Sequence, residues 1–126
     1  MSTTEAAVMT TQEVANRMSE LFKENRWDLV QEELFDENAV SIEPSQSSGL
    51  KTVEGKAAIK KKGEDFNSTV EEVHGGYVTD LVVGGNYISC AMGMDVTMKG
   101  MGRMKMDEIA VYKVKDGKIV SEQFFY

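Results

Sequence analysis

Apolar and polar positions alternate with period two along the second half of the chain, most clearly over residues 107–126, DEIAVYKVKDGKIVSEQFFY. The dipeptide Asp116-Gly117 separates two runs of β-branched and aromatic residues, which is a strong signal of a hairpin with a two-residue turn. Such a turn would pair Val114 with Ile119 and would place Tyr112 opposite Ser121. Both faces of this hairpin carry apolar residues, so each face needs cover from helices, another sheet or another subunit.

Upstream of this region, apolar residues recur at helical spacing instead. The predicted helices cover residues 12–22, 27–35 and 56–66. Thr10 or Thr11 can cap the first of them, and Trp27 is expected on the buried side of the second. The predicted strands cover residues 39–43, 69–82, 87–98, 104–114 and 118–126. Helices followed by an antiparallel meander indicate an α+β fold, and the whole chain, residues 1–126, is predicted to form one domain with a loose lead-in at residues 1–10.

Chained hairpin registers predict which polar side chains meet on the sheet. Two-residue turns after Val83 and near Gly100 place His74, Asp95 and Glu108 on one face, as direct or diagonal neighbours. A three-residue turn or a β-bulge would reverse the parity of a strand. With two-residue turns, these three side chains are candidates for one polar site.

The same predicted face combines small residues at its floor with larger apolar walls, which is typical of a small-molecule pocket. The predicted lining consists of Met104, Met106, Tyr112, Gln123, Phe125, Ala91, Gly93 and Ala110. The opposite face is rich in methionine and is predicted to form a homodimer interface. The apolar residues expected there are Met92, Met94, Ile109, Val111 and Phe124. Cys90 is also expected on that face, away from the polar site, so a nucleophilic role for it is not expected.

Composition and charge exclude several functions. The chain has 126 residues, 41% of them hydrophobic, and a net charge of -7, which is ordinary for a soluble domain and argues against nucleic acid as a partner. One cysteine and one histidine allow neither an internal disulfide nor a structural zinc site. The sequence contains no long apolar run and no secretory signal, so we expect a cytoplasmic protein without membrane contact.

Three segments resemble a known superfamily. They are RWDLVQEELFDENAVSIEP, EGKAAI and the ending YKVKDGKIVSEQFFY. They are similar to the nuclear transport factor 2-like superfamily, and most similar to its SnoaL-like branch, named for polyketide cyclases. The resemblance covers nearly the whole chain. It implies a cone-shaped, strongly bent antiparallel sheet wrapped by three N-terminal helices, usually a homodimer, with a pocket inside.

The resemblance also implies a class of chemistry, because acid–base members of the superfamily move a proton on a small, mostly apolar substrate. Asp95, Glu108 and His74 are then the candidate catalytic residues, and no cofactor is expected. Two close carboxylates resist ionising together, which raises one pKa, and a histidine can shuttle a proton near neutral pH. In the structural alternative, the carboxylates merely accept hydrogen bonds from His74, Arg103 or Lys105.

Two functions stay open at this point. The first is a small pocket enzyme, such as a cyclase, isomerase or dehydratase, that uses carboxylates and a histidine. The second is a non-catalytic dimeric module that binds a small apolar ligand or another protein. Ser41 and Glu43 are placed near the pocket mouth, where a structural role is the simpler interpretation.

Overall fold

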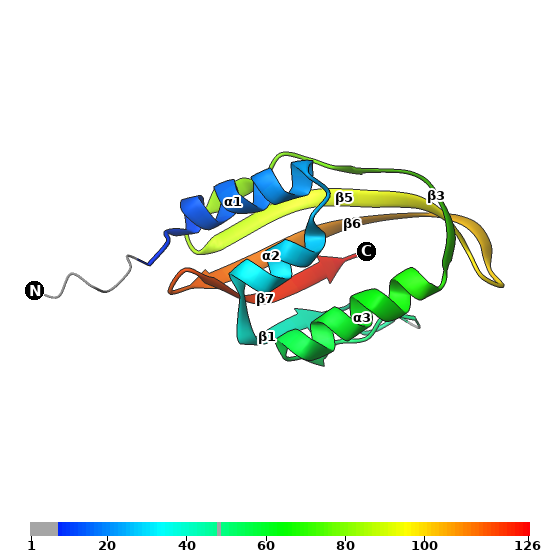
Figure 1. The fold of residues 1–126 in the computed structure, drawn as a ribbon, viewed down its shortest axis with the longest axis horizontal. Helices are drawn as coiled ribbons and strands as arrows, with labels where there is room; N and C mark the ends of the chain where they lie inside the picture. Colours follow the sequence, from blue (N-terminus) through cyan, green and yellow to red (C-terminus); the bar gives the residue numbers. More distant parts are fainter. Residues whose placement is uncertain (1–7, 48) are drawn as a thin grey trace, which may run out of the picture.

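The structure is a computed structural model that describes residues 8–47 and 49–126. Within these residues the chain forms three helices and seven strands (Figure 1). In chain order they are α1 (Thr11–Lys23), α2 (Trp27–Leu34), β1 (Phe35–Ile42), β2 (Val53–Glu54), α3 (Lys56–Ser68), β3 (Val70–Val78), β4 (Val82–Gly84), β5 (Tyr87–Met98), β6 (Gly102–Lys115) and β7 (Lys118–Phe125). The predicted α+β class is confirmed. Most of the predicted lead-in, residues 1–7, lies outside the described residues.

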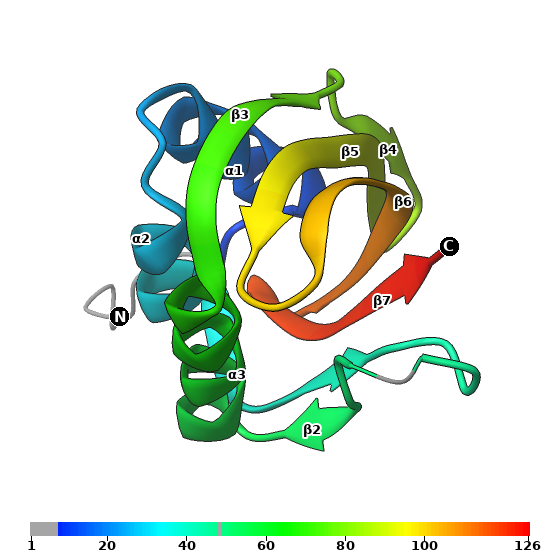
Figure 2. The same cartoon turned by 90° about the vertical axis from the view of Figure 1, so that its right-hand side faces the viewer.

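The strands form one strongly bent sheet in the order β2-β1-β7-β6-β5-β3, with β4 also paired to β5 (Figure 2). The meander β5-β6-β7 is antiparallel as predicted, whereas β1 runs parallel to β7. The sheet is therefore mixed. The strand predicted over residues 69–82 is divided into β3 and β4, because residues 79–81 leave the ladder.

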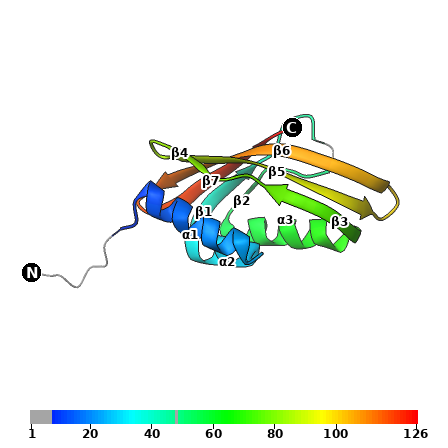
Figure 3. The same ribbon diagram turned by 90° about the horizontal axis from the view of Figure 1, so that it is seen from above.

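The three helices lie on one side of the sheet, seen from above in Figure 3. We call the face they cover the inner face and the opposite one the outer face. Helix α1 begins with a capping box in which Thr10 and Glu13 satisfy each other's backbone N–H groups. Its apolar stripe, including Val14, Met18 and Leu21, is completely buried against the sheet. None of the described helices is long and apolar enough to cross a membrane.

The position of Trp27 differs from the prediction. Its side chain is 40% exposed and stacks on Phe22, with 4.2 Å between the ring centroids. The apolar stripe of α2 consists instead of Val30 and Leu34. Asn25, which has a positive φ of 57°, turns the chain just before α2 and accepts a hydrogen bond from the Trp27 indole. Trp27 therefore packs over the outside of the α1–α2 connection and does not enter the core.

The last hairpin has the predicted turn but not the predicted register. Asp116 and Gly117 have positive φ values of 51° and 76°, as a type I′ turn requires, and Val114 pairs with Ile119. A β-bulge then shifts the pairing by one position, so Tyr112 faces Glu122. The prediction that Tyr112 faces Ser121 is wrong for this reason, and β7 turns Glu122 toward the inner face.

The predicted turn near Gly100 is also wrong by one residue. Met98 pairs with Gly102, which leaves a three-residue turn between β5 and β6. Gly100 and Gly102 have positive φ values of 74° and 80°. Glycine adopts such values without steric cost, so these two positions allow the longer turn. An odd number of turn residues reverses the parity of β6 relative to β5, so the predicted pairing of the polar residues does not form.

Candidate functional site

The three predicted catalytic residues do not come together. Glu108 pairs with Met92 and shares the inner face with buried Cys90 and Tyr112. Asp95 pairs with Lys105 and lies on the outer face. The reversed parity of β6 separates the two carboxylates, because neighbouring side chains of a strand point to opposite faces.

Asp95 and His74 have partners of their own outside the inner face. The Arg103 guanidinium donates to both carboxylate oxygens of Asp95 at 3.0 Å and holds the pKa of Asp95 below its ordinary value. His74 is the extra residue of a bulge in β3, and its Nε2 lies 2.7 Å from Thr97 Oγ1. These contacts match the structural alternative for Asp95, in which the carboxylate satisfies a neighbouring cation.

The predicted pocket lining is divided between the two faces for the same reason. Four of the predicted lining residues lie on the inner face, on the same side of β6 as Glu108: Met104, Met106, Ala110 and Tyr112. The residues that lie on the outer face instead are Ala91, Gly93, Gln123 and Phe125. Only the first group remains available to line a site around Glu108.

The predicted dimer face is divided as well. Met92, Met94 and Phe124 lie on the inner face, whereas Ile109 and Val111 lie on the outer face. Cys90 shares the face of Glu108, contrary to the prediction. Burial raises the pKa of its thiol to about 11, and the Glu108 charge adds to this, so the thiol stays protonated at neutral pH.

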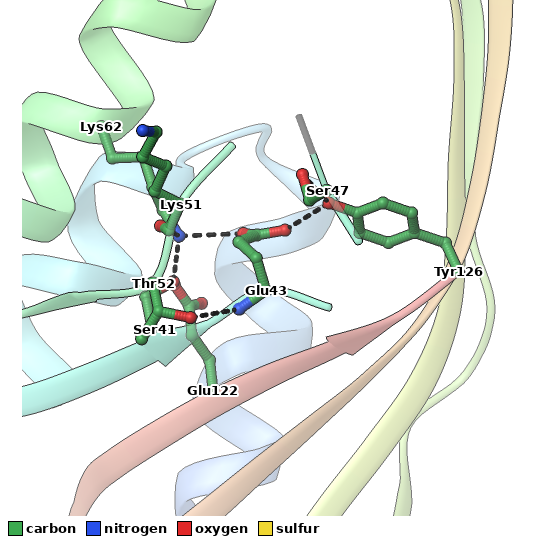
Figure 4. Close-up of polar contacts among 8 residues, drawn as sticks. All are labelled: Ser41, Glu43, Ser47, Lys51, Thr52, Lys62, Glu122 and Tyr126. Atoms are coloured by element: carbon green, nitrogen blue, oxygen red, sulfur yellow. Dashed lines mark hydrogen bonds and ion pairs between the residues drawn. The ribbon is translucent and has the colours of Figure 1, made fainter. Parts of the chain in front are cut away.

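A different polar cluster occupies the inner face where β1, β7 and α3 meet (Figure 4). We call it the Lys62 cluster. Hydrogen bonds join five of its members, Ser41, Glu43, Lys62, Glu122 and Tyr126. Glu108 is the sixth member, because its carboxyl lies close enough for the charges of Glu43, Glu122 and Lys62 to act on its pKa. The parallel pairing of β1 with β7 sets Ser41 beside Glu122. Lys62 reaches the same point from α3, one turn after the buried Ile59.

The ammonium of Lys62 is the centre of the cluster. Its Nζ donates to Ser41 Oγ at 2.7 Å, to Glu43 Oε2 at 2.8 Å and to the backbone oxygen of Lys51 at 3.1 Å. The side chains of Lys62 and Glu43 are only 14% and 3% exposed, so this ion pair is largely shielded from solvent. All three N–H donors of the ammonium have acceptors, and Lys62 is therefore fixed in place.

Two further hydrogen bonds extend the cluster to either side of Lys62. Ser41 Oγ donates to Glu122 Oε2 at 2.7 Å, deep in the sheet. Tyr126 Oη donates to Glu43 Oε1 at 2.8 Å and also contacts Ser47 Oγ at 3.0 Å. A continuous chain of hydrogen bonds thus connects buried Glu122 with half-exposed Tyr126.

Both remaining carboxyls of the cluster have a raised pKa. Burial raises the pKa of Glu122 to about 7, with Glu43 adding to the increase and the Ser41 hydrogen bond and Lys62 opposing it. Burial also raises the pKa of Glu108 to about 7, helped by the charges of Glu43 and Glu122 and opposed by Lys62. A carboxyl with a pKa near the working pH is populated in both protonation states, which suits a general acid or base.

The surroundings of Glu108 are half-buried and apolar. Met92, Met106 and Phe124 share the inner face with it and are half-buried. Two hollows in the described part of the chain lie elsewhere, one of about 290 Å³ beside Asp116 and Gly117 and one of about 100 Å³ between α1 and residues 78–81. Within residues 8–47 and 49–126, no group of three or more acidic, histidine or cysteine side chains is placed to hold a metal ion.

Comparison with known proteins identifies the family. The model of the SnoaL-like domain family matches residues 9–126, which is nearly the whole chain. The chain belongs to the SnoaL-like family. No curated protein matches the chain.

Three solved structures resemble this SnoaL-like chain. A protein from Mesorhizobium loti, named as a candidate SnoaL-like polyketide cyclase, is 34% identical, with a TM-score of 0.86 over 94% of this chain and 100% of that one. A nuclear transport factor 2-like protein from Burkholderia thailandensis is 13% identical, with a TM-score of 0.76 over 93% and 90%. A protein with a ketosteroid isomerase-like fold from Catenulispora acidiphila, in complex with trimethylamine, is 16% identical, with a TM-score of 0.67 over 93% and 87%. These comparisons confirm the predicted superfamily and fold.

Sequence reasoning missed the roles of Lys62 and Glu122 in this SnoaL-like chain. Lys62 belongs to a run of three lysines that is most simply a solvated helix face. Its spacing of three residues from Ile59 was the available signal, since residues three apart share one side of a helix. Glu122 carried no comparable signal, because its orientation depends on a β-bulge that the hairpin sequence does not show.

Proposed function

We propose that this SnoaL-like chain is a cofactor-independent acid–base enzyme that binds a small, largely apolar organic molecule on the inner face and moves a proton on it. The observation that carries the proposal is Glu108, whose half-buried carboxyl has a pKa of about 7 beside the shielded ion pair of Lys62 and Glu43. Perturbed carboxyls of this kind are common where proton transfer takes place.

The two carboxyls have different positions and therefore different roles. Glu108 is half-buried and stands among Met92, Met106 and Phe124, so it is the group that would reach the substrate. Glu122 is 7% exposed and hydrogen-bonded to Ser41, so it is the less accessible of the two. Ionisation of Glu122 makes ionisation of Glu108 harder, so the two titrate as a coupled pair near neutral pH.

The charge balance of the cluster favours neutral or cationic substrates. The cluster holds three carboxyls, those of Glu43, Glu108 and Glu122, and one ammonium, whose donors are already occupied. An anionic substrate would meet mostly negative charge in a poorly solvated setting, where repulsion is strong. The complex of the Catenulispora acidiphila relative with trimethylamine supports a small organic ligand for this fold.

Exchange of C–H protons for deuterium tests the proposed activity. A panel of small cyclic ketones in D₂O, followed by NMR, reports proton abstraction without knowledge of the natural substrate. We expect Glu108→Gln to slow exchange of an accepted ketone by a factor of about 10²–10⁴, the usual contribution of a general base. Asp107→Asn is the matched control, because Asp107 is the next residue of β6 and bonds Tyr77 on the outer face. Equal rates for wild type and Glu108→Gln, or no exchange with any ketone, would contradict the proposal.

A non-catalytic binding module is the second candidate. It is favoured by the position of the two hollows described above, neither of which contains Glu108. A module of this kind would bind apolar ligands while leaving their protons unexchanged. Binding of a ketone that shifts inner-face NMR signals of Met92 or Met106, with no deuterium incorporation, would identify it.

We also propose that the chain forms a homodimer through the outer face of the sheet. Ile109 and Phe125 pair with each other there and remain 46% and 50% exposed. Val111 lies on the same face one pleat further along β6. Neighbouring exposed apolar side chains on a sheet are typical of an interaction surface.

A further inference from the structure

Lys62, Ser41 and Glu122 form a chain of two short hydrogen bonds, each of 2.7 Å. Ser41 is completely buried and Glu122 is 7% exposed, so solvent does not compete for these contacts. The three residues come from α3, β1 and β7, and the hydrogen bonds therefore link a helix to the two parallel strands of the sheet.

The direction of this chain follows from the chemistry of its ends. An ammonium has three donors and no acceptor, so Ser41 Oγ must accept the hydrogen bond from Lys62. The single proton of the Ser41 hydroxyl then needs another acceptor, and in the described part of the chain Glu122 Oε2 is the one within reach. A buried hydroxyl proton without an acceptor is costly, so the orientation of this hydroxyl is fixed.

The fixed hydroxyl decides how Glu122 carries its proton. Oε2 already accepts a hydrogen bond from Ser41, and the carbonyl oxygen of a neutral carboxylic acid is a stronger acceptor than its O–H oxygen. The proton of the neutral acid therefore resides on Oε1. Without Lys62, the Ser41 hydroxyl could turn and accept a proton from Oε2 instead.

We propose that Lys62 is a positioning residue that acts on Glu122 through the Ser41 hydroxyl and directs the proton of Glu122 to Oε1. The catalytic importance of this positioning rests on the proposed function, because an acid–base site needs its proton on a defined oxygen. The hydrogen-bond chain itself does not depend on that function.

The competing explanation is a direct effect of charge. The groups that face Glu122 are Lys62 from α3, Glu43 directly after β1, and Glu108 and Tyr112 from β6. Among them the Lys62 charge lowers the pKa of Glu122 through space whether or not Ser41 is present. Positioning and charge can be separated, because only positioning requires the Ser41 hydroxyl.

A double-mutant cycle on the pKa of Glu122 makes this separation. The pKa is measured by NMR from the side-chain carboxyl carbon in wild type, Lys62→Met, Ser41→Ala and the double variant. We expect each single substitution to raise the pKa, and Lys62→Met to raise it by less than half as much when Ser41→Ala is already present. An equal increase in both backgrounds would overturn the proposal and leave only the direct charge effect.

Glu43→Gln is the matched control for the cycle. In the described part of the chain, the Glu43 carboxylate bonds Lys62 but forms no hydrogen bond with the side chain of Ser41 or Glu122, and its charge raises the pKa of Glu122. We expect this substitution to lower the pKa of Glu122 by similar amounts with and without Ser41→Ala. A strong dependence of the Glu43→Gln effect on Ser41 would show that the cycle reports a general rearrangement, and would overturn the proposal.

A second measurement uses the wild-type chain, in case Lys62→Met does not fold. The buried Ser41 hydroxyl proton should exchange slowly and give its own resonance, which should move downfield as Glu122 ionises and accepts it more strongly. A hydroxyl resonance that ignores the titration of Glu122 would overturn the proposal. Neither result depends on Glu108→Gln, so failure of this inference is distinguishable from failure of the proposed activity.

Discussion

At the scale of single residues, the Lys62 cluster holds more carboxyls than it can keep ionised. Glu43 has the ammonium of Lys62 at 2.8 Å, whereas the hydrogen-bond donor to Glu122 within the described residues is the neutral hydroxyl of Ser41. Burial without a direct cation favours the neutral acid, which explains why the pKa of Glu122 is raised. The cluster therefore lowers the stability of the fold at neutral pH, and in return two of its carboxyls can gain and lose protons at that pH.

The stability of the fold should reflect this arrangement. A folded-state pKa of about 7 for Glu122 lies above the value of about 4.3 for glutamate in an unfolded chain, so the folded state binds the proton more tightly. The stabilising contribution of Glu122 is therefore complete below about pH 4 and is lost as the pH rises through about 7. Carboxyls whose pKa is lowered, such as Glu33 beside Arg17, act in the opposite direction and at lower pH.

Glu122→Gln removes the ionisable group while keeping an oxygen that can accept from Ser41. We expect the variant to be more stable than wild type at pH 8 by up to ~4 kcal/mol, since each pKa unit corresponds to about 1.4 kcal/mol, and nearly equal in stability at pH 4.5. Urea denaturation at the two pH values measures the difference. A stability change that is the same at both values would show that Glu122 titrates normally.

At the scale of elements, the sequence predicted the three helices and the long strands in their order, but it missed the short strand β2 and the parity of the strands. The Asp116-Gly117 turn was predictable because its signal lies within two residues that accept positive φ. Gly100 lies in the β5–β6 turn and Gly102 begins β6, so either glycine could end the turn and its length was not determined locally. The bulges at His74 and Val120 accompany the bending of the whole sheet. Each bulge reverses the alternation of side chains along its strand, and this reversal determines which polar side chains lie on the inner face.

Gly93 illustrates how parity changes the meaning of a residue. It was predicted as part of a pocket floor, but its missing side chain makes room on the outer face for Tyr77, which crosses it to bond Asp107 at 2.7 Å. A Cβ at this position would lie 2.5 Å from the Tyr77 ring and 2.6 Å from Asp107 Oδ1. Gly93 is therefore a contact point between β3, β5 and β6.

Gly93→Ala should destabilise the fold by about 1–3 kcal/mol, the usual cost of overpacking, and should release the Tyr77 hydroxyl. Gly75→Ala is the matched control on β3, because nothing lies within 4 Å of its added Cβ. Thermal denaturation of both variants measures the difference. Equal melting temperatures for the two would contradict the assigned packing of Tyr77 over Gly93.

At the scale of the whole molecule, the helices cover the inner face and leave the outer face open to a second copy. The sequence predicted a homodimer but assigned to its interface three inner-face residues, Met92, Met94 and Phe124. The outer-face surface around Ile109 and Phe125 is smaller than that prediction and also contains polar side chains such as Gln123. A dimer formed there would bury Ile109 near its centre.

Ile109→Lys should weaken this dimer strongly, because burying an unpaired ammonium is costly. Met101→Lys is the control, since Met101 is 69% exposed in the turn between β5 and β6. Sedimentation equilibrium should give twice the chain mass for wild type and for the control, and the mass of one chain for Ile109→Lys at micromolar concentration. A wild-type protein that sediments as a single chain would contradict the proposed dimer.

The central claim is that Glu108, half-buried on the inner face, exchanges protons near neutral pH. The most direct test is an NMR titration of its side-chain carboxyl carbon in the full chain, with Glu108→Gln used to assign the signal. The account predicts a pKa of about 7, which falls when Glu122→Gln removes one of the neighbouring charges. A Glu108 carboxyl that titrates near 4.3, as in an unfolded chain, would contradict the account and leave the proposed substrate site without its general base.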